Sequence, residues 1–368
     1  FTVNAMAMKA DSLKIIDPHG GKKDLEDGIL RTVRDPNKRF EEDALRIMRA
    51  ARFATELDFK IEEGTRRAIT EKAGLLEAIA KERIRDEFVK IIMCERAASG
   101  IVLLEEMGIL RYVAPELREG LGVGQNKHHI YGVFEHNVRA LEYTAKKNYS
   151  LEVRLASLLH DVGKPRVKRG DGPDSTFYNH DIVGGKMTLG ILDRLKFSKE
   201  ITGHAAHLVR YHLFYYNVGE VSEAGVRRFL NRVGPEYVDD LMKVREADRI
   251  GSGVPKAVPY KLRHLMFMID KVRRDPLSAK MLAVDGLAVM KIANLEPSPK
   301  VGYILAALLE EILEDPKKNE KTFLEERIKE LAGFSDKKLK ELSASSKKKT
   351  EEFEGGIEEE MKRKHYVK

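Results

Sequence analysis

Four polar residues in the middle of the chain are of the types that bind metal ions. His160 and Asp161 adjoin at the end of the apolar segment LASLL. His136 lies in the earlier segment GVFEHNVRALEYTA, and Asp248 in the later segment DDLMKVREADRIG. Imidazoles and carboxylates from three helices could together bind a divalent metal that activates water. Lys164, one turn beyond His160, is placed to meet a phosphate. The simpler interpretation of His160-Asp161 is a hydrogen-bonded pair in the core.

The order of these residues resembles the HD superfamily of metal-dependent phosphohydrolases, whose pattern is His, then His-Asp, then a distant Asp. All four positions match, and HDVGK is close to the usual sequence motif of that family. In the dinuclear members a second metal is bound, and here His180 with His204 or His212 could supply it. Hydrogen-bonded helix histidines are the equal alternative for these three. His128 and His129 are expected in a loop.

A second group of charged residues lies near the N-terminus. Glu42, Asp43, Arg46, Arg49 and Arg52 follow one another at spacings of three and four, or adjoin, which predicts that several share one helix flank. A solvated face with salt bridges is the usual outcome for such charges. An Asp and an Arg one turn apart, however, can also read the Watson–Crick edge of a base.

This region resembles the class II tRNA nucleotidyltransferases, the CCA-adding enzymes, and the related bacterial poly(A) polymerases. The segments that carry the resemblance occur in order: FTVNA, IDPHGGKKDL, LRTVRDPNKRFEEDALRIMRAARFATELDF and AKERIRDEF. The resemblance implies that Glu42, Asp43 and Arg46 form a protein template. Asp43 and Arg46 would hydrogen-bond the base of incoming CTP or ATP, with Arg49 beside them, and Asn4 would lie near the sugar and triphosphate.

Other segments match further parts of the same family. Those of the C-terminal half, such as LAVDGLAVM and PSPKVG, resemble the family's tail, which would contact tRNA. The residues that match the turn after the head and the neck helices are Asp17, Gly20, Gly21, Asp24, Leu25, Glu82, Arg83 and Glu87.

The predicted fold is mainly α: the remnant of an α/β nucleotidyltransferase head, then a helical neck, an HD-type helical body and a helical tail. Short strands are expected in FTVNAMAM, LKIID and ILRTV, and the period changes to helical from Phe40, with more helices through about Leu117. The expected domains are the C-terminal part of the head (1–60), the neck (61–121), the body (122–253), the tRNA-binding tail (254–335) and a charged disordered tail (336–368).

The chain is expected to be truncated at its N-terminus. Nucleotidyl transfer in this family needs an Asp-x-Asp strand that holds two Mg²⁺ ions, and FTVNAMAM opens the sequence without it. The remaining cofactor is a divalent metal of unknown identity at the HD site.

Composition limits the partners. The 368 residues carry a net charge of +7, compatible with a polyanion such as tRNA. No apolar run has the length of a membrane span, and one cysteine fits a reducing cytoplasm.

The leading hypothesis is tRNA 3′-end CCA addition from CTP and ATP, with a possible metal-dependent phosphohydrolase activity of the HD body. Three alternatives stay open: a free-standing HD phosphohydrolase acting on nucleotides or RNA ends, a non-catalytic tRNA-binding module, and a bacterial poly(A) polymerase.

Overall fold

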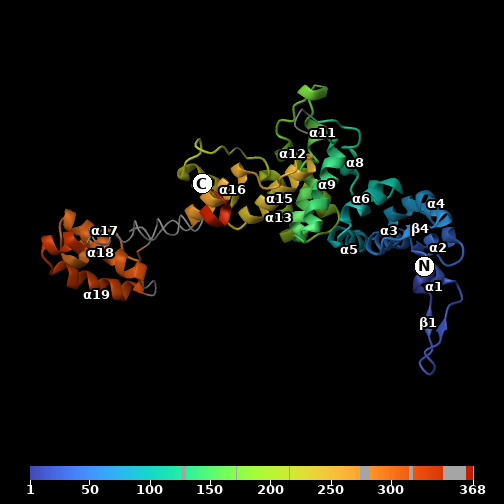
Figure 1. The fold of residues 1–368 in the computed structure, drawn as a ribbon, viewed down its shortest axis with the longest axis horizontal. Helices are drawn as coiled ribbons and strands as arrows, with labels where there is room; N and C mark the ends of the chain where they lie inside the picture. The colour runs from blue at the N-terminus through green and yellow to red at the C-terminus, as the bar shows by residue number, and fades with distance from the viewer. Residues whose placement is uncertain are drawn as a thin grey trace. The chain divides into compact units, whose positions relative to one another are not determined.

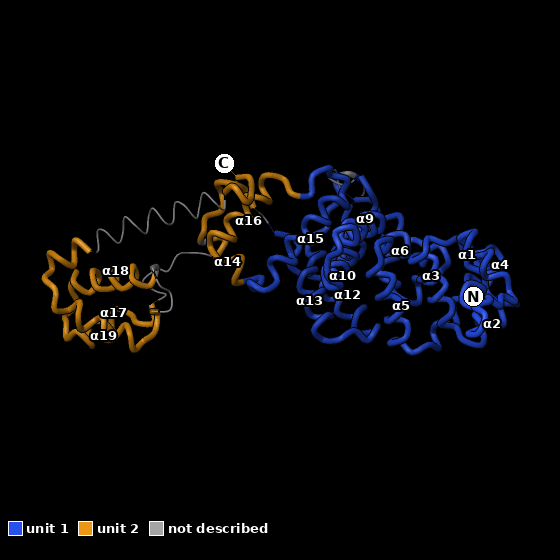
Figure 2. The backbone as a smooth tube through the Cα atoms, turned by 60° about the horizontal axis from the view of Figure 1, so that its bottom comes forward, with its two compact units in different colours: residues 1–215, 232–257 blue, residues 216–231, 258–368 orange. Residues whose placement is uncertain are grey.

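The computed structural model describes residues 1–125, 130–170, 172–214, 216–273, 282–314, 318–342 and 362–367. The predicted loop histidines His128 and His129 lie outside these ranges. The chain forms two compact units, residues 1–215 with 232–257 and residues 216–231 with 258–368 (Figure 2). Helices dominate both units, and short strands occur in the N-terminal part, which confirms the predicted mainly α fold. Within the described ranges, every helix is too short or too polar to span a bilayer.

The N-terminal part of unit 1 contains all four short strands of the described residues (Figure 1). Strands β1 and β2 form an antiparallel hairpin, whereas β3 and β4 pair in parallel. The elements of this part are η1 (Thr2–Asn4), β1 (Ala7–Met8), β2 (Ile15–Ile16), α1 (Gly21–Glu26), β3 (Ile29–Leu30), α2 (Pro36–Glu42), α3 (Leu45–Leu57), β4 (Lys60–Ile61), α4 (Glu63–Lys72) and η2 (Ala73–Ala78).

The predicted strand at the start of the chain is wrong over Thr2–Asn4, which is a 3-10 turn. The Thr2 hydroxyl donates to the Asp24 carboxylate at 2.7 Å, and this bond holds the turn against α1. A Cβ on Gly21 would lie 2.2 Å from the Thr2 carbonyl oxygen, so only glycine permits the contact. The carboxylate of Asp17 accepts hydrogen bonds from the backbone amides of Gly21 and Lys22, which starts α1.

Glu42 and Asp43 do not share a helix with Arg46, Arg49 and Arg52, because the chain breaks between α2 and α3. Asp43 is extended at the break, with φ −155° and ψ 99°. Its carboxylate accepts a hydrogen bond from the Leu45 amide at 3.2 Å, a local bond that competes with helix continuation. Glu42 therefore ends one helix and Arg46 lies in the next.

The rest of unit 1 is helical. Helices α9, α10, α12, α13 and α15 pack on one another and form what we call the helical body (Figures 1 and 2). Every residue of α10 from Val153 to Leu159 is buried, so this helix lies at the centre of the body. The elements are α5 (Lys81–Met93), α6 (Ala97–Glu106), α7 (Leu110–Val113), α8 (Pro115–Arg118), α9 (Val133–Lys146), α10 (Leu151–Leu159), α11 (Lys164–Val167), η3 (Gly172–Asp174), α12 (His180–Arg194), α13 (Lys199–Tyr211) and α15 (Val238–Gly251).

Unit 2 has its own apolar core, built mainly by the helices over residues 286–293, 299–314 and 321–332. Val289, Ile304, Leu324 and Leu339 are completely buried in it. Residues 343–361 and Lys368, part of the predicted disordered tail, lie outside the described ranges. The helices are α14 (Glu223–Val233, whose last two residues belong to unit 1), α16 (Tyr260–Arg273), α17 (Gly286–Ala293), α18 (Pro299–Glu314) and α19 (Lys321–Ala332).

One buried arginine joins the helical body to α5. Arg154 of α10 is 1% exposed, and its guanidinium donates only to neutral oxygen atoms among the described residues. These acceptors are the carbonyls of Ile92, Cys94, Ala145 and Tyr149 and the side chain of Asn148. The side chain thus satisfies carbonyls at the end of α5 that would otherwise be buried without a partner.

We expect Arg154→Met to lower the free energy of unfolding by about 3 kcal/mol, because several buried carbonyls lose their donor at once. Chemical denaturation measures the change. Arg67→Met, an exposed arginine of α4, is the matched control and should change stability by less than about 0.5 kcal/mol. Equal stability of the two variants would contradict the role given to Arg154.

Candidate metal centre and nucleotide site

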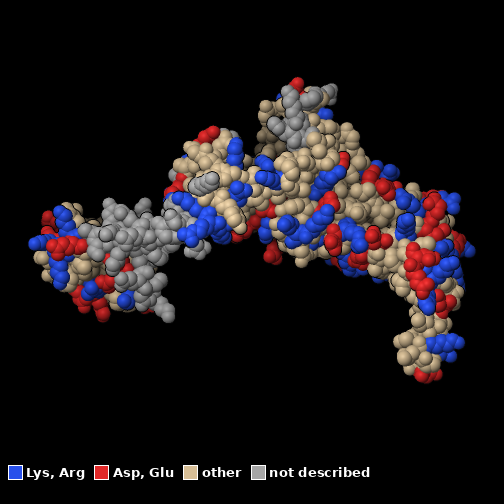
Figure 3. Space-filling model, viewed as in Figure 1, with Lys and Arg blue, Asp and Glu red and all other residues tan. Residues whose placement is uncertain are grey.

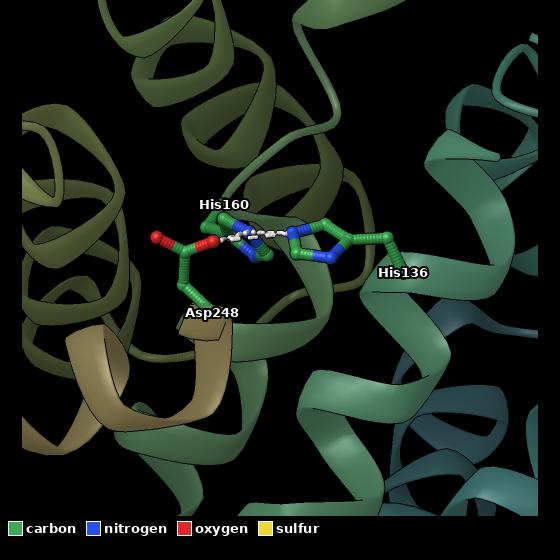
Figure 4. Close-up of side chains that lie close together, drawn as sticks. All are labelled: His136, His160 and Asp248. Carbon is green, nitrogen blue, oxygen red and sulfur yellow. Dashed lines mark hydrogen bonds and ion pairs between the residues drawn. The ribbon is translucent and has the colours of Figure 1, made fainter. Parts of the chain in front are cut away.

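Three predicted metal ligands meet inside the helical body (Figure 4). His136 comes from α9, His160 follows the last residue of α10, and Asp248 comes from α15. The Nε2 atoms of His136 and His160 lie 2.8 Å apart, and Oδ1 of Asp248 lies 3.3 Å from Nε2 of His136. All three residues are buried. We call His136, His160 and Asp248 the first cluster.

Asp161 lies between this first cluster and a second one. Its Oδ2 is 3.1 Å from His136 Nε2, while its Oδ1 is 3.3 Å from His180 Nε2 and 3.7 Å from His212 Nε2. Asp161, His180 and His212 are all buried and form a second group of metal-binding geometry, which we call the second cluster. The two oxygen atoms of one carboxylate thus face different clusters.

The sequence left open whether His204 or His212 accompanies His180, and the structure brings His212 to the site. His204 instead lies 3.2 Å from the Asp240 carboxylate, and its ring packs against Tyr237.

Backbone carbonyls select the tautomer of three of these histidines. Nδ1 of His160 lies 2.8 Å from the Ser157 carbonyl oxygen, and His180 and His212 make equivalent contacts of 2.6 and 2.7 Å with the third residue before each. A carbonyl oxygen can only accept, so Nδ1 must carry the proton. In the neutral ring, Nε2 then presents a lone pair to the cluster, as in metal-binding histidines.

The charges at the site are strongly coupled. Burial alone would lower the pKa of His160, but Asp161 and Asp248 outweigh it and raise the pKa to about 10. Burial alone would raise the pKa of the Asp161 carboxyl, yet His160 and Lys164 hold it well below its usual range. For His212, burial and the charge of His160 lower the pKa to about 3, so this imidazole is neutral at pH 7.

The donor set fits a divalent cation. Oδ1 of Asp161 and Nε2 of His180 are buried and make no hydrogen bond of ordinary geometry with any described residue, whereas Oδ2 of Asp161 is ion-paired with Lys164 at 2.6 Å. Buried polar atoms of this kind normally have a partner, and imidazole with carboxylate is a common ligand set for divalent transition metals. The two clusters could therefore hold one or two metal ions.

Two glycines allow the helices to approach closely enough to form the site. A Cβ on Gly163 would lie 2.4 Å from the His180 carbonyl oxygen, so the turn after Asp161 rests directly on α12. A Cβ on Gly251 would lie 2.8 Å from the His136 carbonyl oxygen, which brings α15 close to α9. The glycine of the HDVGK segment thus has a packing role.

A cavity of about 660 Å³ opens beside the clusters, and its wall includes Asp161, His180, His212 and Asp248. Lys164 also lines it, but its ammonium lies 2.6 Å from Asp161 Oδ2 and donates to Gln125 Oε1 at 2.5 Å. Arg245, Arg249 and Tyr178 also line the cavity. These three residues were not predicted from the sequence, although the two arginines that flank Asp248 in READR were a visible signal.

The template residues lie at the junction of α2 and α3. Arg46 donates to the Glu42 carboxylate and to the Arg39 carbonyl, both at 2.8 Å. Asp43 has a different partner, Arg83 of α5, at 3.6 Å. The side chains of Asp43 and Arg46 are 27% and 28% exposed, so both remain accessible to a ligand.

Arg49 and Arg52 turn toward α5 instead of toward the template. The buried carboxylate of Glu87 lies 2.7 Å from Arg52 Nε and 3.7 Å from Arg49 Nε. Asn4 is exposed on η1. Phe1, the residue that precedes η1, packs its ring against that of Phe53 on α3. Figure 3 shows cationic and anionic side chains interspersed over this part of unit 1.

Two sequence families match the chain. Residues 58–121 match the family described as a probable RNA and SrmB-binding site of polymerase A. Residues 133–251, which include all members of both clusters, match the HD domain family.

Several characterised proteins are similar over most of the chain. The A-adding tRNA nucleotidyltransferase of Deinococcus radiodurans is 39% identical over 84% of this chain and 73% of its own length. The CC-adding tRNA nucleotidyltransferase of Thermus thermophilus is 33% identical over 84% of this chain and 71% of its own. The Multifunctional CCA protein of Neisseria meningitidis is 32% identical over 77% of this chain and 68% of its own.

One solved structure, the CCA-adding enzyme of Bacillus stearothermophilus in complex with CTP, is 26% identical with a TM-score of 0.51. The likeness covers 90% of this chain and 72% of that one. The fold, the two matched families and the level of identity agree, and the chain belongs to the family of CCA-adding tRNA nucleotidyltransferases, as a member with an HD domain.

Proposed function

We propose that this protein adds nucleotides to the 3′ end of tRNA, using CTP, ATP or both, and that Asp43 and Arg46 select the base. The observation that carries this proposal is the pair itself: a carboxylate and a guanidinium, both partly exposed, at the junction of α2 and α3. A carboxylate accepts from the amino group of a base and a guanidinium donates to its ring nitrogen or carbonyl oxygen.

Neighbouring residues hold this pair in place. Arg83 lies beside the Asp43 carboxylate, and Glu42 with the Arg39 carbonyl holds the Arg46 guanidinium. Both groups of metal-binding geometry among the described residues lie in the helical body, not beside Asp43. We therefore assign only base recognition to these residues. Binding of Mg²⁺ at the transferase site is not part of their role.

Asp43→Ala and Arg46→Ala should each lower kcat/KM for the correct nucleotide about tenfold to a hundredfold and relax the choice between CTP and ATP, because one bidentate contact discriminates by about 1–3 kcal/mol. The assay follows extension of tRNAs that end before, within or after the CC sequence, with the full gene product. Asp11→Ala, an exposed carboxylate between β1 and β2, is the control. Unchanged nucleotide choice in both template variants would contradict the assignment. Repeated addition of A would favour a poly(A) polymerase.

We further propose that the helical body hydrolyses phosphoesters at nucleotide or RNA ends, such as 2′,3′-cyclic phosphates. The observation that favours it is the shared carboxylate of Asp161 between the two clusters, on the wall of a cavity that also holds cationic side chains. A divalent metal bound there would lower the pKa of water and polarise a phosphoryl oxygen.

The protein residues have separate tasks in this reaction. His136, His160 and Asp248 would hold one metal. Asp161 would also contact this metal and would orient the imidazoles beside it. Lys164 neutralises charge at Asp161 and lies where a phosphoryl oxygen can approach it. His180 and His212 would extend the site to a second metal.

His160→Ala should abolish hydrolysis of cyclic phosphates and lower the bound metal measured on the purified protein, because an imidazole of the first cluster is lost. His204→Ala removes a histidine of the same body that belongs to neither cluster, and should retain both metal and activity. If His160→Ala still hydrolyses cyclic phosphates, the phosphohydrolase proposal is wrong. Hydrolysis without any nucleotide transfer would favour a free-standing phosphohydrolase. Tight, salt-sensitive tRNA binding with neither activity would favour a binding module.

A further inference from the structure

A short turn beside the metal centre carries both a cluster histidine and an exposed aromatic ring. The Phe177 carbonyl accepts the Nδ1 proton of His180, and Asn179 between them has a positive φ of 62°. This turn aims His180 inward and leaves Tyr178 75% exposed on the wall of the cavity. The same backbone segment therefore positions an aromatic face at a set place relative to the second cluster.

The helix that carries Asp248 contributes two cations to the same cavity. Arg245 and Arg249 lie one turn apart on α15, and both line the cavity. Arg245 is ion-paired with Asp248. Arg249 has no carboxylate partner among the described residues, and its Nε reaches only the Lys256 carbonyl, at 3.4 Å. An arginine without an acidic partner on a cavity wall is suited to a bidentate contact with phosphate.

We propose that Tyr178 and Arg249 are the residues that select a nucleotide in this cavity: the base stacks on Tyr178, and Arg249 holds a phosphate oxygen. The inference rests on the proposed phosphohydrolase function, since it assigns the residues that give that site its preference for a base. A base has a π-face that stacks on an aromatic side chain without sequence preference. A volume of about 660 Å³ is within the range of small-molecule sites.

The chemistry of the wall distinguishes a nucleotide from simpler phosphoesters. Lys164 and the clusters alone would bind any small phosphate monoester or diester. Tyr178 would add nothing for such a ligand, because a group without an aromatic base has no face to stack. The combination therefore favours nucleotides over sugar phosphates, and Tyr178 acts in specificity rather than in the chemical step.

The test compares two probes that differ by the base, adenosine 5′-phosphate and ribose 5-phosphate, by calorimetry on the metal-loaded protein. Tyr178→Ala should weaken binding of the nucleotide about tenfold, the effect of one lost stacking contact, and leave ribose 5-phosphate unchanged. Tyr178→Phe keeps the ring and should bind as the wild type does. Arg249→Met should weaken both probes.

Tyr366→Ala, an exposed tyrosine that does not line the cavity, is the control and should bind both probes normally. Normal nucleotide binding by Tyr178→Ala, or an equal loss for both probes, overturns the inference. The two proposals fail separately. Nucleotide binding that depends on Tyr178 without hydrolysis would refute the phosphohydrolase and support the nucleotide site. Hydrolysis that is unchanged in Tyr178→Ala, together with unchanged nucleotide binding, would support the phosphohydrolase and refute the role of Tyr178.

A short RNA with a 3′-phosphate distinguishes the source of the nucleotide. If the ligand is an RNA end, the wild type should bind this RNA at least tenfold more tightly than adenosine 3′-phosphate, and Tyr178→Ala should weaken both. If it is a free nucleotide, the mononucleotide should bind as well as the RNA. If Tyr178→Ala binds both the RNA and the mononucleotide as tightly as the wild type does, the proposed site is wrong.

Discussion

The helical body is organised around a carboxylate that has almost no contact with water. Asp161 is 1% exposed, and an ionised carboxylate in such surroundings is very unfavourable without compensating charge. His160 and Lys164 supply the positive charge that keeps it ionised, and His136, His180 and His212 present ring nitrogens to it from three other helices or from the residue after one. Each helix must therefore place one group within a few ångströms of the same side chain, which restricts how the body can pack.

A second buried charge connects this body to α5. Arg154 reaches across from α10 to the end of α5, the helix that also carries Arg83 beside the template residue Asp43. α5 therefore contacts the template at one end and the helical body at the other. Its buried Glu87 lies 2.7 Å from Arg52 Nε and 3.7 Å from Arg49 Nε, so two further contacts hold α3 and α5 together. The pair proposed to select the nucleotide and the candidate metal centre thus share one structural element.

Sequence patterns predicted most of this arrangement, and the exceptions have physical causes. The four HD positions were found because residue type and order are visible without coordinates. The break at Asp43 was missed because the apolar stripe continues past it while one side chain caps the next helix. His204 and His212 lie on one helix, so only packing against α12 could decide between them. Tyr178 gave no periodic signal, since its position depends on a local turn. Arg249 was visible beside Asp248 in READR, but its place on the cavity wall depends on residues from other segments.

The hydrogen bonds that orient His160, His180 and His212 all end on main-chain carbonyls three residues earlier. Such an acceptor is present whatever side chain that earlier residue carries. The ligand geometry is therefore insulated from substitution at Ser157, Phe177 and Val209, provided that the backbone path is kept. Homologous bodies could vary widely in the sequence around the centre while retaining the same proton positions on its imidazoles. A proline insertion or a one-residue deletion before any of the three histidines would be far more damaging than an exchange of side chains.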